Sequence, residues 1–384
     1  MIPSLYIHIP FCKRKCNYCD FVSYAGKEEM IEGYVETLTQ ELKEKTSKFI
    51  PPLPVPRRSS GQVGEGLAAL QTIYFGGGTP TLLRPDHFAK ILFESRISNL
   101  ESLEITVEAN PGTVNKDYLK ELRQLGINRL SLGAQTFNDR HLKTLGRIHS
   151  SKDIYQAVED ARTAGLQNIS LDLIFALPDQ TLEEWKEDLS QAINLEPNHL
   201  STYNLQIEEG TPFAKMTNAE LQMPNEEIEA EMYEHTIETL TAKGYHHYEI
   251  SNFAQPGREC RHNINYWKNG NYIGIGAGAH SHVNGRRWAN PDPVEEYVKN
   301  SLNGFETRTE LRASSIVTTI KTDKRETLFL GLRLIEGLPT KTFEGFENEV
   351  SELLNDGLLI RQNGNYKLSK RGLFLANLVF EKFV

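Results

Sequence analysis

The chain has 384 residues, of which 39% are hydrophobic and 24% are charged, and this composition predicts a globular protein with a substantial buried core. Its length fits one large domain and a smaller one. The formal net charge of −9 argues against broad electrostatic binding to nucleic acid or to an anionic membrane surface.

The N-terminal sequence has neither the basic region nor the apolar stretch of a signal peptide, and no run of about 18 apolar residues occurs in the chain. Four cysteines, three of them between residues 12 and 19, do not form the disulfide framework of a secreted protein. We therefore expect a cytoplasmic protein, in a reducing compartment, whose clustered cysteines bind metal.

Nearly continuous apolar runs alternate with amphipathic helical patterns over the first two thirds of the chain. Such runs are typical of parallel strands that helices cover on both faces. They predict strands at 5–9, 70–75, 103–109, 127–135, 168–177 and 199–207. The helical patterns predict helices near 29–49, 84–97, 115–125, 151–164, 181–195 and 225–243. Six β-α units in series predict a parallel α/β sheet, either doubly wound or curled toward a barrel, and polar residues at nearly every strand end favour the barrel.

Two parts of the first 322 residues depart from this rhythm. The segment 51–66 is rich in Pro, Gly and Ser without periodicity, so we expect a disordered insertion within a barrel domain that spans 1–245. Residues 246–322 contain a strand-like run at 246–254, the stretch HNINYW and a glycine-rich run at 271–282. We interpret this part as an extension of the barrel.

The last part of the chain, 323–384, has a different order of elements. Two helical patterns are followed by two short strand-like runs that turn at Asn363-Gly364, and a closing helix starts at Lys370. The order helix, helix, hairpin predicts a small α+β, winged-helix-like C-terminal domain.

Cys12, Cys16 and Cys19 have the spacing C-x3-C-x2-C, and Asp20 follows the third cysteine. A structural zinc site needs four protein ligands, and a second cysteine pair does not occur in this sequence. A 4Fe–4S cluster held by three thiolates keeps one iron free for an exchangeable ligand. The spacing therefore favours an iron–sulfur cluster, and a zinc ion completed by Cys260 or a histidine is the alternative.

Polar or flexible residues follow the other predicted strands. GGGTP at 76–80 follows the second strand, and consecutive glycines there allow close backbone approach to a carboxylate or phosphate through their amides. Glu108, Gln135 and Asp172 lie at or near the ends of later strands, and Arg147 follows the fourth. Each has an ordinary structural explanation by itself, but together they line one face of the predicted barrel and favour a binding site.

These motifs resemble the radical S-adenosylmethionine superfamily, whose hallmark is C-x3-C-x2-C in the first loop of a partial (β/α)6 barrel. YIHIPFCKRKCNYCDF, YFGGGTPT, VEANP, LGAQTF, LGRIH and LDLIFALP are similar, over most of 4–300, to the oxygen-independent coproporphyrinogen III oxidase group. The resemblance implies that the amino and carboxylate groups of S-adenosylmethionine chelate the open iron. It also implies a set of residues that flank the cluster or contact this cofactor: Tyr6, Tyr18, Gly77, Gly78, Thr79, Glu108, Gln135, Arg147 and Asp172.

Two differences from that group point to a subgroup. The oxidases carry a further cysteine two residues after the third, where this chain has Phe21, and they carry an N-terminal arm before the barrel, whereas the first strand here starts near residue 5. HNINYW at 262–267 is instead similar to the H-N-x-x-Y-W motif of the HemW heme chaperones. That resemblance implies a protein that binds heme and delivers it to apoproteins such as respiratory hemoproteins, with no assigned catalytic residue.

The HNINYW motif supplies the candidate heme ligands. His262 is a chemically reasonable axial ligand, and Tyr266 or Trp267 could stack on the porphyrin. A histidine beside aromatic residues is also frequently a packed core residue, and His280, His282 and Cys260 are rival ligands.

Two other functions stay open at this point. Oxidative decarboxylation of coproporphyrinogen by a radical mechanism is the first, and a zinc-stabilised nucleic-acid-binding module is the second. The winged-helix-like tail has a modest basic cluster, but the acidic chain disfavours nucleic acid, so we expect a lid, dimer or partner-docking role for it. A homodimer and a peripheral membrane contact through partners are compatible with the sequence.

Overall fold

The computed structural model describes residues 3–49, 70–95, 100–216, 221–301, 316–317 and 320–384. The predicted insertion at 51–66 lies outside these residues. No described helix combines the length and the apolar character needed to cross a membrane.

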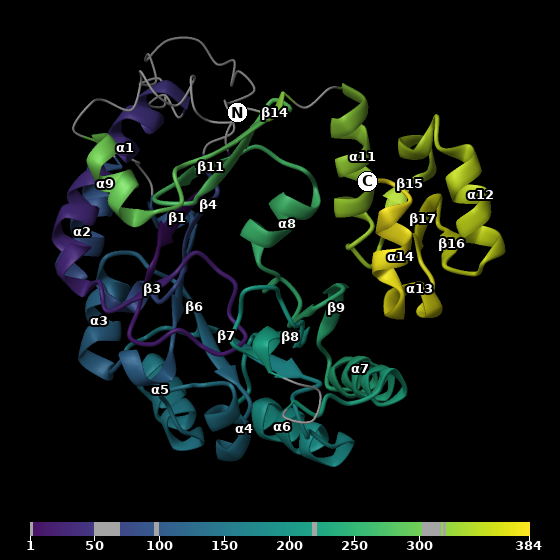
Figure 1. Ribbon diagram of the computed structural model, residues 1–384, viewed down its shortest axis with the longest axis horizontal. Helices are drawn as coiled ribbons and strands as arrows, with labels where there is room; N and C mark the ends of the chain where they lie inside the picture. The colour runs from purple at the N-terminus through teal and green to yellow at the C-terminus, as the bar shows by residue number, and fades with distance from the viewer. Residues whose placement is uncertain (1–2, 50–69, 96–99, 217–220, 302–315, 318–319) are drawn as a thin grey trace, which may run out of the picture.

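Six parallel strands form the centre of the molecule and lie side by side in chain order (Figure 1). They coincide with the six predicted strands, so the prediction of a parallel α/β sheet is confirmed. The sheet is open, because its order runs from one edge strand to another without returning, and this agrees with a partial barrel. The strands are β1 (Ser4–Ile9), β4 (Thr72–Gly77), β5 (Glu104–Ala109), β6 (Arg129–Gln135), β7 (Asn168–Phe175) and β8 (His199–Asn204).

Further strands extend both edges of this sheet. β11 (Tyr272–Ile275) pairs in parallel with β1. Beyond it, antiparallel pairs add β12 (His280–Val283), β13 (Arg286–Ala289) and β14 (Ile316–Val317). β10 (Asn252–Ala254) pairs antiparallel with β8, and β9 (His246–Glu249) pairs with β10.

The single strand predicted at 246–254 is wrong, because the chain reverses at Ile250 and Ser251 to make β9 and β10. Two hydrogen bonds fix this reversal. The Tyr233 hydroxyl donates to the Ile250 carbonyl at 2.8 Å, and the Thr202 amide donates to the Ser251 carbonyl at 2.8 Å. Contacts from elements distant in sequence therefore make the turn.

Helices cover the outer face of the parallel sheet (Figure 1). The amphipathic stripe predicted on the first helix is buried as expected, since Tyr34, Val35, Leu38 and Leu42 are each fully buried. A short helix that the sequence did not predict, α4 (Asp139–Thr144), precedes α5. The covering helices are α1 (Ile31–Phe49), α2 (Pro85–Glu94), α3 (Lys116–Gln124), α5 (Ser151–Thr163), α6 (Leu182–Asn194) and α7 (Glu226–Ala242).

The C-terminal part has its own hydrophobic core, separate from the core of the sheet. The predicted hairpin is confirmed, with Asn363 and Gly364 at φ values of +51° and +81° between its two strands. The closing helix is broken at Leu375. The elements are α11 (Ile320–Gly331), β15 (Leu338–Pro339), α12 (Glu347–Asn355), β16 (Leu359–Gln362), β17 (Asn365–Leu368), α13 (Lys370–Phe374) and α14 (Ala376–Glu381).

Helix α8 (Arg261–Trp267), which carries HNINYW, contacts both β4 and α11, and so lies between the sheet and the C-terminal part (Figure 1). Helix α9 (Val294–Ser301) packs against α1 on the opposite side. The described elements therefore place HNINYW on the inner face of the sheet, away from the covering helices.

A buried carboxylate ties α1 to the β11–β13 extension. Glu41 is fully buried and pairs with Lys45 at 2.6 Å. It also accepts hydrogen bonds from the Gly276 amide at 2.9 Å, the Tyr297 hydroxyl at 2.6 Å and the Asn290 side chain at 2.7 Å. One carboxylate thus satisfies four donors that would otherwise be buried with fewer partners.

Replacement of this carboxylate should destabilise the fold. We expect Glu41→Ala to lower the free energy of unfolding by about 3 kcal/mol, because it leaves the buried Lys45 ammonium without its counter-charge. Urea unfolding followed by far-ultraviolet circular dichroism measures this change. Glu36→Ala, an exposed position on the same helix, is the control and should change stability by no more than about 0.5 kcal/mol. Equal effects of the two substitutions would contradict the role of Glu41.

Candidate functional site

The three-cysteine loop crosses the carboxyl end of β1. Two short strands, β2 (Phe11–Cys12) and β3 (Tyr24–Ala25), pair in parallel and close the base of the loop. Asn17 anchors its middle: its amide donates to the Leu145 carbonyl at 3.0 Å and its side-chain amide to the Thr144 carbonyl at 2.8 Å. The Asn17 carbonyl accepts from the Phe213 amide at 3.0 Å.

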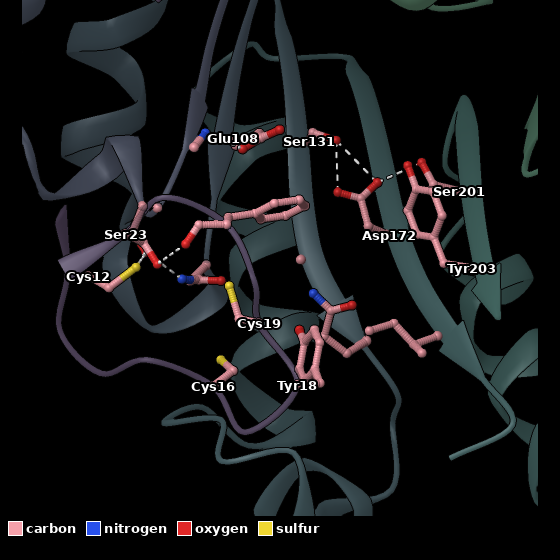
Figure 2. A pocket seen from close by; sticks show the side chains of 18 of the residues that line it. Cys12, Cys16, Tyr18, Cys19, Ser23, Glu108, Ser131, Asp172, Ser201 and Tyr203 are labelled. Carbon is pink, nitrogen blue, oxygen red and sulfur yellow. Dashed lines mark hydrogen bonds between the residues drawn. The ribbon is translucent and has the colours of Figure 1, made fainter. Parts of the chain in front are cut away.

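The three thiols are free and line one end of a cavity (Figure 2). The Thr79 hydroxyl donates to Cys12 Sγ at 3.5 Å, and Arg147 Nη1 donates to Cys16 Sγ at 3.5 Å. Burial raises the pKa of the Cys12 and Cys19 thiols. Hydrogen bonds to sulfur are typical of iron–sulfur sites, where they tune the cluster.

The cysteine sulfurs do not converge on a single ion. Among the described residues, no group of three His, Cys, Asp or Glu side chains has a geometry that could hold one metal ion. A zinc ion requires its sulfurs at about 2.3 Å, whereas a 4Fe–4S cluster binds each sulfur to a different iron and so keeps them apart. Three free thiols on one loop are the donor set that such a cluster takes.

The glycine segment after β4 packs directly beneath this loop. A Cβ atom on Gly78 would lie 2.7 Å from the Phe11 carbonyl oxygen and 3.0 Å from Cys12 Sγ. Gly77 has a φ of +117°, which disfavours any other residue. The chain can therefore approach the Cys12 sulfur only because this segment lacks side chains.

The amides of the glycine segment have partners within the protein. The Gly77 amide donates to Glu108 Oε2 at 3.1 Å, the Gly78 amide to the Ile9 carbonyl at 2.9 Å and the Thr79 amide to the Phe11 carbonyl at 2.8 Å. The observed contribution of this segment is space beside Cys12, and its contact with a cofactor stays a prediction.

The cavity has a volume of about 520 Å³ and extends from the cysteine loop across β4–β8. Figure 2 shows the cysteines at one side and Asp172 and Tyr203 at the other. The predicted cofactor residues line it with one exception. Those that line it are Tyr18, Gly77, Gly78, Thr79, Glu108, Gln135, Arg147 and Asp172. The exception is Tyr6, whose hydroxyl is 3.0 Å from His8 Nδ1 and whose ring stacks on Tyr74.

Glu108 and Asp172 are two half-buried acids that line the cavity. The Tyr74 hydroxyl donates to Glu108 Oε1 at 2.8 Å, and burial raises the pKa of Glu108 to about 7, with the nearby Asp172 adding to the rise. Asp172 accepts from the hydroxyls of Ser131 at 2.9 Å and Ser201 at 2.8 Å, and its pKa is also raised by burial (Figure 2). Both acids are placed to bond hydroxyl or ammonium groups of a ligand.

Arg147 and Gln135 complete the wall between the acids and the cysteines. Arg147 Nη2 donates to the Gly133 carbonyl at 2.9 Å and to Asn110 Oδ1. The Asn110 side-chain amide donates to Thr79 Oγ1 at 2.9 Å, so a chain of contacts links Arg147 to the cysteine loop. Gln135 adopts a left-handed φ of +68° next to an irregularity in the β6–β7 pairing, and such strain is frequent at functional sites.

Several residues of the site were not predicted from the sequence. Ser131 lies opposite Glu108 in the β5–β6 register, and Ser201 lies opposite Asp172 in the β7–β8 register. The period-two alternation of strands, counted from Glu108 and Asp172 to neighbouring strands, would have identified these serines. Further missed lining residues are Tyr74, Asn110, Arg129, Phe21 and Tyr203.

His262 is buried, with 1% of its surface exposed. Its Nδ1 lies 2.8 Å from the Thr72 hydroxyl and its Nε2 lies 2.9 Å from the Tyr266 hydroxyl. Burial lowers the pKa of His262 to about 3. The Arg333 guanidinium lies 4.4 Å from the centre of a Trp267 ring. Of this helix, Asn263 is the residue that lines the cavity among those described.

The rival heme ligands lie elsewhere. His280 is exposed at the start of β12, and His282 is buried with Nδ1 3.2 Å from the Gly270 carbonyl. Cys260 is buried, its Sγ is 3.8 Å from Glu104 Oε1, and burial raises the pKa of this thiol to about 12. These three side chains are not among the described residues that line the cavity.

Comparison with known proteins places this site in a family context. The sequence model of the Radical SAM superfamily matches residues 6–192, and that of the HemN C-terminal domain matches residues 321–375. Proteins named heme chaperone HemW are similar along the whole chain. That of Bacillus subtilis is 38% identical and that of Lactococcus lactis 37%, each alignment covering 99% of this chain and 99% and 97% of the relative, respectively.

The Escherichia coli protein named heme chaperone HemW is 35% identical over 99% of this chain and 98% of its own length. Among solved structures, coproporphyrinogen III oxidase (HemN) from Escherichia coli superposes with a TM-score of 0.80 at 23% identity, covering 99% of this chain and 89% of that one. At this identity the structural similarity shows the shared fold.

The raised pKa of Glu108 makes the stability of the ligand-free protein depend on pH. The folded protein retains the Glu108 proton up to about pH 7, whereas the unfolded chain releases it near the ordinary pKa of 4.5. The native state therefore loses stability as pH rises through this interval. We expect Glu108→Gln, which cannot ionise, to raise the melting temperature at pH 8 and to have little effect near pH 5.

Thermal unfolding of both proteins between pH 5 and 8 measures this difference. Glu183→Gln is the control, because Glu183 is exposed and its hydrogen bond from Lys186 lowers its pKa, so it should give no gain at pH 8. If Glu108→Gln raised the melting temperature by the same amount at every pH, the raised pKa of Glu108 would be contradicted.

Proposed function

We propose, on the premise that this chain belongs to the HemW family within the radical S-adenosylmethionine superfamily, that it is a heme chaperone. In this proposal Cys12, Cys16 and Cys19 hold a 4Fe–4S cluster, S-adenosylmethionine occupies the adjoining cavity, and the chain binds heme and passes it to apoproteins. The carrying observation is the set of three free thiols at one end of a cavity of about 520 Å³, in a chain similar to HemW proteins over its full length.

The cluster would supply an open iron that the amino and carboxylate groups of S-adenosylmethionine can chelate. Around it, Thr79 and Arg147 donate hydrogen bonds to two of the sulfurs. We assign Glu108 and Asp172 to hydroxyl or ammonium groups of the cofactor, since both are half-buried acids that line the cavity. Tyr18, Gly77, Gly78 and Gln135 would shape the remaining wall.

The heme ligands predicted from HNINYW require a rearrangement of that helix. Ligation through His262 Nε2 would replace its contact with the Tyr266 hydroxyl, and a porphyrin on Trp267 would displace the Arg333 guanidinium. His262, Tyr266 and Trp267 therefore stay predicted ligands, for a state in which α8 has moved. We propose that α8, with the contacts of His262 and Trp267 described above, is in its heme-free state.

We also propose where the protein acts, which partners it serves and how its chain is divided. We propose cytoplasmic localisation, delivery to respiratory hemoproteins, and a membrane contact made through those partners. Residues 1–245 would form the barrel, 246–322 its extension and 323–384 a winged-helix-like module for partner docking or dimerisation. The separate core of the last module supports its treatment as an independent unit.

The substitution Gly78→Ala, which adds one methyl group, tests the cluster site. We expect Gly78→Ala to fold but to lose most of its iron and sulfide, because the added Cβ would meet both the Phe11 carbonyl and Cys12 Sγ. Anaerobic reconstitution followed by iron and sulfide analysis measures the loss. Gly33→Ala, within α1 and with open space around its Cβ position, is the control and should retain the full cluster. Full cluster occupancy in Gly78→Ala would contradict the proposed placement.

Reconstitution also separates the candidate functions. We expect the wild-type protein to take up about four irons and four sulfides per chain, to bind heme, and to form no protoporphyrinogen from coproporphyrinogen. Cys16→Ser should lose the cluster. Formation of protoporphyrinogen would replace the chaperone proposal by an oxidase, and zinc without iron or sulfide would defeat both. Heme titration of His262→Ala tests the predicted axial ligand. An unchanged heme spectrum and affinity would exclude His262 as that ligand.

A further inference from the structure

The mouth of the cavity exposes two aromatic rings. Among the large apolar side chains that are exposed in the described part of the chain, Phe21 at 70% and Tyr203 at 42% are the two that line the cavity. Single exposed apolar residues are common, but a pair at the rim of one cavity is typical of a binding site.

Both rings are held on fixed backbone. The Phe21 carbonyl accepts from Lys15 Nζ at 3.3 Å and from the Ser23 hydroxyl at 3.2 Å, which fixes the residue while its ring stays in solvent. Tyr203 lies on β8 in register with Ile174 of β7, and Figure 2 shows it on the side of the cavity opposite the cysteines. The rings therefore belong to opposite walls, and a ligand would find them already in place.

Charge divides the cavity into two parts. The inner part contains the half-buried acids Glu108 and Asp172, which suit hydroxyl and ammonium groups. On the outer part, Arg14 and Lys15 line the cavity on the same loop as Phe21, and the Lys15 ammonium lies directly on the Phe21 backbone. An aromatic ring beside two cations suits a flat apolar ligand that carries carboxylates.

We propose that heme, as the cargo of the proposed function on which this inference rests, binds at the outer end of the cavity, as the alternative to the ligands predicted from HNINYW, with its ring between Phe21 and Tyr203 and its carboxylates at Arg14 and Lys15. Asp20 and Glu208 also line this part, and their negative charge repels the heme carboxylates. The carboxylates are therefore directed toward Arg14 and Lys15. This site needs no movement of α8, whereas ligation by His262 does.

Heme titration of the cluster-loaded full-length protein, followed by its Soret absorbance under anaerobic conditions, tests the aromatic contacts. We expect the double substitution Phe21→Ala, Tyr203→Ala to weaken heme binding about tenfold or more, since each aromatic contact contributes on the order of 1 kcal/mol. Phe93→Ala is the matched control, because Phe93 is 81% exposed on α2 and does not line the cavity, and it should bind heme like the wild type.

The two proposals fail in different ways in this experiment. Heme binding by the wild type with an unchanged affinity in the double variant overturns the site and leaves the chaperone proposal standing. Absence of heme binding by the wild type overturns both. Iron and sulfide analysis of each variant verifies that the substitutions at the rim have left the cluster in place.

The carboxylate contacts have their own measurement. We expect the dimethyl ester of heme to bind the wild type about tenfold more weakly than heme, and the combined Arg14→Gln, Lys15→Gln substitution to reduce this difference. The ester removes the carboxylate charges while it keeps the porphyrin face. Equal binding of heme and its ester by the wild type would overturn the assignment of the basic residues.

Discussion

The attachment of the cysteine loop to the end of α4 and to the turn at Phe213 is the constraint on which the site depends. Asn17 makes it, with two hydrogen bonds to the 144–145 segment and one from Phe213, while β2 and β3 close the base of the loop. These bonds hold the polar loop over the edge of the sheet. With them, three sulfurs, the glycine segment and Arg147 meet in one place.

The inner face of the sheet carries two acids that line the cavity. Glu108 and Asp172 are half-buried, and desolvation raises the pKa of both, which is unfavourable for their charged forms. Hydroxyl groups from Tyr74, Ser131 and Ser201 offset part of this cost. Proteins retain such destabilising groups where they bind ligands, because a ligand that replaces water recovers the interaction.

The strands and the cluster cysteines were predictable because both are local patterns. Apolar runs specify parallel strands, and the spacing of Cys12, Cys16 and Cys19 specifies one loop with three thiolates. Features that depend on contacts between distant segments were not predictable in this way. The reversal at Ile250 depends on Tyr233, and the amide of Gly77 donates to Glu108 on the next strand of the sheet. No local pattern records such pairings.

The residue that separates this chain from the oxidase pattern is also the one that exposes the aromatic rim. The resemblance implies a fourth cysteine two residues after the third in the oxidases, and here Phe21 occupies that position with most of its ring in solvent. A thiol at the cavity mouth suits redox chemistry, whereas a phenyl ring offers a surface for a flat ligand. Because the backbone around it is fixed by Lys15 and Ser23, exchange of this one side chain alters the ligand surface without altering the fold. The same barrel can therefore serve conversion of a porphyrin precursor in one family and carriage of a finished porphyrin in the other.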